Sequence, residues 1–108
     1  MIARIWRGTV RSADAEAYAA YMHETGLAAY AATPGNLDAR MLRRALADGR
    51  TEFVMVSVWD SLEAVKAFAG DDYEQAVFYP EDERFLVTRE LRVAHYDVAA
   101  SVPARRDR

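Results

Sequence analysis

The stretch Phe53-Val54-Met55-Val56-Ser57-Val58-Trp59-Asp60-Ser61-Leu62-Glu63-Ala64 decides the fold of this chain. Side chains along a strand point alternately to the two faces of its sheet. One face would carry Phe53, Met55, Ser57 and Trp59, and the other would carry Val54, Val56 and Val58. Because both faces are largely apolar, the pattern predicts a central strand whose sheet is covered on both sides.

The chain on either side of this strand completes an alternation of strands and helices. Strand patterns occupy residues 2–10, 37–46 and 86–98, and helical patterns occupy residues 12–32 and 61–70. We expect residues 71–83 to be irregular, with a short helical turn around residues 74–77. The order β-α-β-β-α-β with right-handed crossovers predicts an α+β, ferredoxin-like domain over residues 1–98. Its four-stranded antiparallel sheet would have the first and third strands at the centre, and residues 99–108 would form a disordered tail.

The composition excludes several classes of protein. The 108 residues suit one domain, and a net charge of −3 gives no general attraction for nucleic acid or anionic membranes. There is no cysteine, and so neither disulfides nor thiolate chemistry is available. With no apolar run of membrane-spanning length and no signal-peptide layout at its start, the chain is expected to be cytoplasmic.

An apolar sheet face that no helix covers predicts self-association. Two short helices can cover only one face, which leaves Val54, Val56 and Val58 exposed in a monomer. A second subunit that lays its sheet against this one by two-fold symmetry would cover them, and we therefore expect a homodimer. The alternative is a monomer whose long loop folds over the sheet.

Three pieces of the sequence carry a family resemblance: residues 2–8 (IARIWRG), Pro34-Gly35-Asn36, and residues 58–64 (VWDSLEA). With the element order, they make the chain resemble the dimeric α+β barrel superfamily, specifically domains of the antibiotic biosynthesis monooxygenase type. The resemblance implies a dimer with a pocket between sheet and helices. It implies no single reaction, since the family includes cofactor-free quinone-forming monooxygenases, haem-degrading enzymes, isomerases and members without known chemistry.

The resemblance also allows the haem-degrading branch to be tested. That branch uses an Asn on the first strand, a Trp at the end of the third strand, and a His on the second helix as iron ligand. Trp59 matches, but Trp6 stands at the Asn position and no His occurs between Asp60 and Ala94. Haem degradation by that arrangement is therefore not expected.

Aromatic and apolar side chains are predicted to line the pocket. The family places Trp59 there, and strand alternation adds Arg4 from the first strand to the same side. The other expected substrate-binding residues are Trp6, Ser57, Met55, Phe53 and Phe68. Such a set suits a flat, conjugated ligand, although for each aromatic taken alone an ordinary core role is the simpler interpretation.

Three residues are candidates for catalysis. Arg4 would either hold an oxygen anion of the ligand or form an internal salt bridge with Glu52 or an acid of the run 81–83. His95 would be a general base or a partly buried edge-strand histidine, and the pattern does not fix which sheet face it occupies. Tyr79 would donate a hydrogen bond from a pocket lid, whereas the acids that follow it also suit a solvated turn.

The sequence has no Gly-rich phosphate loop, no nucleophile elbow and no metal-ligand spacing, and so we expect neither cofactor nor metal. The first functional hypothesis is a cofactor-independent monooxygenase, or a related isomerase or cyclase, acting on a small aromatic or polyketide-like substrate. The alternative is a non-catalytic ligand-binding or stress-response module of the same fold. A purely structural partner is the third hypothesis, and a collapsed core without a pocket would favour it.

Overall fold

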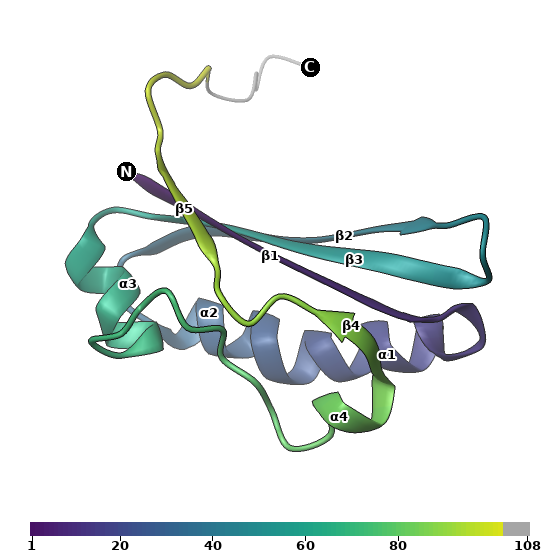
Figure 1. The fold of residues 1–108 in the computed structure, drawn as a ribbon. Coiled ribbons are helices and arrows are strands. Elements are labelled where there is room, and N and C mark those ends of the chain that lie inside the picture. The colour runs from purple at the N-terminus through teal and green to yellow at the C-terminus, as the bar shows by residue number, and fades with distance from the viewer. Residues whose placement is uncertain (103–108) are drawn as a thin grey trace, which may run out of the picture.

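A single antiparallel sheet with all of its helices on one face organises the computed structural model, which describes residues 1–102 (Figure 1). The strands are β1 (Ile2–Arg11), β2 (Asn36–Ala45), β3 (Arg50–Trp59), β4 (Leu86–Arg89) and β5 (Ala94–Asp97). They lie in the order β2-β3-β1-β4, and β5 also pairs with β1. The ferredoxin-like α+β class and the central position of β1 and β3 are therefore confirmed.

The last strand differs from its prediction. One strand was expected over residues 86–98, but the structure has two short ones, separated by a break at residues 90–93. In the break the backbone turns to a different partner: Ala76 N–H donates to Leu91 O (2.9 Å), and Val93 N–H donates to Glu74 O (2.7 Å). Tyr73 and Glu74 form a turn, Gln75 forms an isolated bridge with Arg92, and no helix occurs at residues 74–77, so the expected helical turn there is wrong. The short helix α4 is Asp82–Phe85.

The first helical region is a composite of four segments. It begins with a 3-10 turn, η1 (Ser12–Asp14), and continues through α1 (Ala15–Met22), the π turn η2 (His23–Leu27) and α2 (Ala28–Ala32). Gly26 is buried inside the π turn, where an added Cβ would lie 2.8 Å from Cε of Met22. The absent side chain therefore lets Met22 pack directly against the helix backbone.

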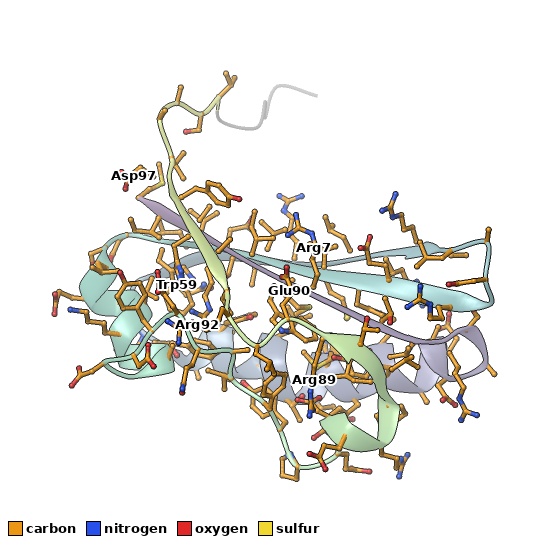
Figure 2. The ribbon with its side chains drawn as sticks, in the orientation of Figure 1. Arg7, Trp59, Arg89, Glu90, Arg92 and Asp97 are labelled. Carbon is orange, nitrogen blue, oxygen red and sulfur yellow. The ribbon has the colours of Figure 1, made fainter. Side chains whose placement is uncertain are left out.

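The core lies between the sheet and the helices. Along β3 the residues Phe53, Met55, Ser57 and Trp59 are buried, as the alternation predicts. Figure 2 shows Trp59 on the helix side of the sheet and Arg7 on the open side. The second predicted helix is α3 (Leu62–Ala69), where Ser61 accepts a hydrogen bond from Ala64 N–H. No helix within residues 1–102 is both long and apolar enough to cross a membrane.

The sheet's other face carries no helix (Figure 1). Val54, Val56 and Val58 lie there, half-buried, in register with side chains of β1 and β2. The register places Ile5 and Leu42 on the same face, and Leu42 is 48% exposed. Ala99–Val102 has no regular secondary structure, and the remainder of the predicted disordered tail, residues 103–108, lies outside the described residues.

Candidate functional site

A small cavity lies between the sheet, the composite helix and the segment that connects α3 to α4. Its volume is about 20 Å³, which is enough for one water molecule. The polar lining consists of Arg4, Tyr18, Tyr30, Tyr79 and Asp82, and the apolar lining of Trp6, Met22, Gly26, Met55, Phe68, Val77 and Val93. Five polar side chains around so small a space make this the candidate functional site.

Arg4 lies on the cavity wall and is only 2% exposed. Its Nη1 donates to Tyr73 O (2.6 Å), and its Nη2 donates to Gln75 O (3.2 Å). The guanidinium also lies over the ring of Phe68, at 5.5 Å from the ring centroid. Within residues 1–102 it forms no ion pair, and so the expected salt bridge with Glu52 or an acid of the run 81–83 is wrong. Arg4 is therefore a buried cation held by neutral partners.

The electrostatics around Arg4 favour an anionic ligand. Burial lowers the pKa of Arg4, and the nearby Tyr30 opposes that change. An arginine stays protonated in proteins even so, and a buried charge without a counter-ion is costly. Burial likewise raises the pKa of Tyr30, so this hydroxyl is neutral and can donate. A phenolate, enolate or carboxylate oxygen beside Arg4 would supply the missing negative charge.

His95 contacts Arg4 rather than the cavity. It lies opposite Arg4 in the pairing of β1 with β5, and its Nε2 is 2.9 Å from Nη1 of Arg4. This answers which face His95 occupies: it shares the helix-side face with Arg4. The ring is half-buried and packs edge-on against Tyr73. Nε2 is engaged by Arg4, so His95 helps to position the guanidinium, whereas Nδ1 is buried without a hydrogen-bond partner in the described part of the chain. The role of His95 as a general base stays a prediction.

The two indole N–H groups are both used inside the protein. Trp6 lines the cavity, but its Nε1 donates to Glu90 O (2.8 Å). Trp59 is fully buried behind Phe68, and its Nε1 donates to Ser57 Oγ (2.9 Å). Of the predicted substrate-binding residues, Met55, Phe68 and Trp6 reach the cavity, whereas Trp59, Ser57 and Phe53 belong to the surrounding core.

The cavity also contains a second polar group, in which Tyr79 was a predicted site residue but Tyr18 and Asp82 were not. The hydroxyls of Tyr18 and Tyr79 and Oδ1 of Asp82 are buried and have no hydrogen-bond partner. The other carboxylate oxygen of Asp82 accepts Tyr79 N–H at 2.6 Å. Burial raises the pKa of Tyr79 to about 12, and it also raises the pKa of Asp82. The sequence interpretation treated residues 79–83 as a pocket lid or a solvated turn, and the i, i+3 spacing of Tyr79 and Asp82 was the signal that could have identified Asp82.

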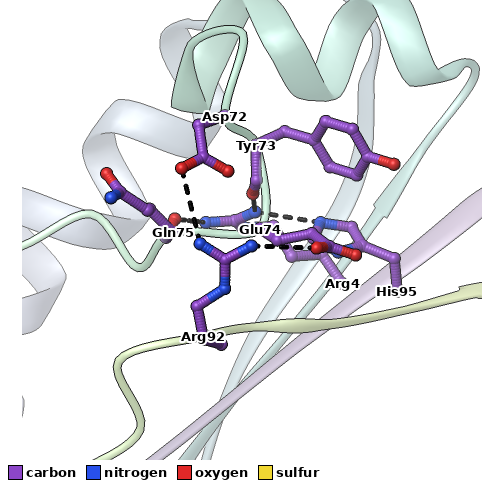
Figure 3. Close-up of polar contacts among 7 residues, drawn as sticks. All are labelled: Arg4, Asp72, Tyr73, Glu74, Gln75, Arg92 and His95. Atoms are coloured by element: carbon purple, nitrogen blue, oxygen red, sulfur yellow. Dashed lines mark hydrogen bonds and ion pairs between the residues drawn. The ribbon is translucent and has the colours of Figure 1, made fainter.

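The segment that closes the cavity, residues 71–82, is here called the covering segment. Arg92 holds it from outside: Nη2 lies 3.0 Å from Oε1 of Glu74, and Nη1 lies 3.4 Å from Oδ2 of Asp72 (Figure 3). Arg4 holds it from inside through the carbonyls of Tyr73 and Gln75. Any ligand larger than a water must displace part of this segment or the flexible Met22. No cluster suited to a metal ion occurs among the residues that the structure describes.

Comparison with known proteins agrees with this architecture. The sequence profile described as antibiotic biosynthesis monooxygenase matches residues 1–78. No curated protein matches the chain in sequence.

Solved structures share the fold at low sequence identity. A candidate antibiotic biosynthesis monooxygenase from Bacillus cereus has a TM-score of 0.66 and 19% identity over 98% of both chains. The heme-degrader MhuD from Mycobacterium tuberculosis, with two hemes in its active site, gives 0.64 and 18% over 95% of this chain and 100% of that chain. SnoaB, a cofactor-independent oxygenase from Streptomyces nogalater, gives 0.59 and 21% over 95% and 97%. At such identities the likeness establishes the fold alone.

The cavity does not fit the haem site that the resemblance implies. Helix α3 contains no histidine, and the chain has only His23 and His95. His95 directs Nε2 at Arg4, and the N–H of Trp6, the residue that the resemblance puts at the Asn position, is bound to Glu90 O. We expect hemin to cause no stoichiometric Soret shift; such a shift, followed by haem breakdown with a reductant, would contradict this reading.

Proposed function

We propose that this chain, which belongs to the antibiotic biosynthesis monooxygenase family, is a cofactor-independent monooxygenase acting on a small aromatic or polyketide-like substrate. The observation that carries the proposal is Arg4: a buried guanidinium, without a carboxylate partner among residues 1–102, on the wall of a cavity lined by aromatic rings. Such a group stabilises a delocalised anion by charge, by hydrogen bonds and by confinement away from water.

The chemistry needs only the substrate and dioxygen. A base removes a proton from an activated methylene, and the resulting carbanion is delocalised onto an oxygen held by Arg4. The anion transfers one electron to dioxygen, and the radical pair combines into a peroxide. The peroxide takes up a proton and loses water, leaving a carbonyl, so that R₂CH₂ and O₂ give R₂C=O and H₂O. The protein supplies anion stabilisation and an environment without water.

The test is oxygen uptake with a panel of hydroquinones and anthrones. We expect consumption of one dioxygen per quinone formed, without added flavin, metal or haem, and loss of that activity in Arg4→Met. If substrates bind but no oxygen is consumed, the chain is not a monooxygenase. An isomerase or cyclase of the same site would convert its substrate without oxygen.

The size of the cavity favours one second candidate, a non-catalytic ligand-binding or stress-response module. The cavity of about 20 Å³ has room for one water molecule only, and a binding protein that orders around its ligand would have such a resting form. Ligand binding under the covering segment, with neither turnover nor oxygen uptake, would support the ligand-binding module.

We also propose that the protein functions as a homodimer. The open sheet face presents Ile5, Leu42, Val54, Val56 and Val58 to solvent in the single chain. A second copy, packed face to face, would cover these side chains by two-fold symmetry.

A further inference from the structure

We infer that Asp82 is the proton acceptor of the cavity and takes the substrate's proton directly on Oδ1; this inference rests on the proposed function. Asp82 is 3% exposed and lines the cavity. Its two carboxylate oxygens differ in their hydrogen bonds. Oδ2 is fixed by Tyr79 N–H at 2.6 Å, whereas Oδ1 is buried without a partner. One oxygen therefore orients the carboxyl group and the other is free to receive a proton.

The surroundings of Asp82 suit a base rather than a structural ion pair. Among residues 1–102 no lysine or arginine lies within salt-bridge distance of it: Glu81 pairs with Arg84, and Glu83 pairs with Arg89. The neighbours inside the cavity are the hydroxyls of Tyr18 and Tyr79, which are themselves unpartnered. Burial, the larger effect, raises the pKa of Asp82, whereas Arg89 acts through its charge from beyond salt-bridge distance and lowers it. A buried carboxylate without a directly paired cation is a stronger base than one at the surface.

Asp82 and Arg4 lie toward different ends of the cavity. Arg4 stands opposite Ser57 in the pairing of β1 with β3, whereas Gly8 stands opposite Phe53. Tyr18 packs on Phe53 with ring centroids 4.9 Å apart, and so it lies near the level of Gly8. Four residues of strand separate the backbone at the two levels by roughly 13 Å, which is a spacing of Cα atoms and not of the guanidinium and the carboxyl group. The charge of Asp82 acts on Tyr18, whereas Asp82 is not among the groups that act on Arg4, and so the base and the anion holder lie toward different ends.

This arrangement, with the base and the cation toward different ends of the cavity, suits a substrate whose acidic C–H and anionic oxygen lie at opposite sides of a conjugated ring. In an anthrone the methylene and the carbonyl face each other across the central ring. The methylene proton moves to Oδ1 of Asp82, and the C–H electron pair is delocalised through the ring onto the oxygen at Arg4. No oxidant takes part in this step, and the proton on Asp82 is available later for the water that leaves.

The step can be measured without oxygen, as exchange of the anthrone methylene protons in D₂O under anaerobic conditions. We expect the wild-type protein to accelerate exchange and Asp82→Asn to slow it by at least ~100-fold, the usual contribution of a general base. The amide oxygen of Asn can still accept Tyr79 N–H, so the fold and the anthrone affinity should be retained. Glu81→Gln, at the exposed neighbouring acid, is the matched control and should exchange like wild type.

The outcomes separate this inference from the proposed function. Exchange that is equal in Asp82→Asn and wild type, with equal affinity, overturns the role of Asp82 and leaves another base to be found. Absence of exchange in the wild-type protein also overturns it. Exchange that depends on Asp82 but occurs without oxygen uptake supports the role of Asp82 and rejects the monooxygenase. A circular-dichroism melt of Asp82→Asn shows whether a loss of proton exchange results from unfolding of the variant.

Discussion

Nη1 of Arg4 and Nε2 of His95 lie 2.9 Å apart, on opposite residues of β1 and β5. A guanidinium donates hydrogen bonds and cannot accept them. Nε2 of His95 must therefore be the acceptor, and the imidazole must be neutral with its proton on Nδ1, which is buried without a hydrogen-bond partner among residues 1–102. Burial, and then the charge of Arg4, lowers the pKa of His95, which agrees with this assignment. His95 fixes the guanidinium whose charge the proposed reaction uses.

Acidification should weaken this contact. Because the pKa of His95 is lower in the folded than in the unfolded protein, its stabilisation is present above about pH 6.5 and is lost as the pH falls through the folded value. Protonated His95 would repel Arg4, while Glu74 offsets part of this effect. We expect thermal melts between about pH 7.5 and about pH 5 to show a loss of about 1 kcal/mol from this bond.

Two glutamine variants isolate that effect. His95→Gln keeps an acceptor but does not titrate, and so its stability should depend less on pH over this interval. His23→Gln, at the exposed histidine of the π turn, should behave like wild type. Equal pH dependence in His95→Gln and wild type would show that the Arg4–His95 contact does not respond to protonation.

Arg4→Met should separate binding from stability. The variant leaves the carbonyls of Tyr73 and Gln75 without their donor, which costs about 1–3 kcal/mol per unsatisfied group. Removal of a buried charge offsets part of that loss. We expect a modest fall in the free energy of unfolding, and a fall of at least ~10-fold in the affinity for an anionic hydroxyanthraquinone, measured by fluorescence titration.

The matched control for this experiment is Arg7→Met. Arg7 lies on the same strand but on the open face, where its pair with Glu90 is long at 3.9 Å. Its loss should leave ligand affinity unchanged, because Arg7 lies on the opposite side of the sheet from the cavity. Within the single chain its exposed pair contributes only about 0–1 kcal/mol to stability. Unchanged affinity in Arg4→Met, with altered melting, would remove Arg4 from the binding site and leave it a purely structural role.

The sequence correctly predicted the sheet face on which each residue of β1 and β3 lies, because this depends only on strand periodicity. Side chains alternate between the two faces along both β1 and β3. This alternation predicted that Arg4 and Met55 lie on the helix side, and the structure places them there. Periodicity also identified Val54, Val56 and Val58 as the opposite face. These predictions need only the two-residue repeat of a strand and the knowledge of which face the helices cover.

What the sequence did not predict depends on contacts between distant segments. Tyr18 and Asp82 are 64 positions apart and meet only because the covering segment folds back over the composite helix. That path is set by backbone hydrogen bonds between residues 74–76 and 91–93, which no local pattern encodes. The same bonds interrupt the last strand, and therefore the predicted single strand at residues 86–98 was too long.

Gly26→Ala should fill the cavity without unfolding the protein. An added Cβ would lie 2.8 Å from Cε of Met22 and 3.9 Å from Cε2 of Tyr79. Met22 is flexible and can move, and alanine favours a helix over glycine by about 1 kcal/mol, so the free energy of unfolding should change by no more than about 1 kcal/mol. We expect ligand affinity to fall at least ~10-fold by titration. Unchanged affinity would show that ligands do not use this cavity.

Val56→Lys should dissociate the proposed homodimer. Val56 lies at the middle of the open face, between Ile5 on β1 and Arg40 on β2. In a face-to-face dimer a lysine there would bury an unpaired charge, and Arg40 beside it would add like-charge repulsion. An uncompensated buried charge costs about 3–5 kcal/mol, which weakens association by ~100-fold or more.

Light scattering and sedimentation at micromolar concentration measure this change. The wild-type chain should have the mass of a dimer and Val56→Lys the mass of a folded monomer, with the circular-dichroism spectrum preserved. Ala20→Lys adds the same charge to an exposed position of α1, on the opposite layer of the molecule, and should remain dimeric. A monomeric wild type would refute the dimer, and a dimer that tolerates Val56→Lys would mean that association uses a different surface from the valine face of β3.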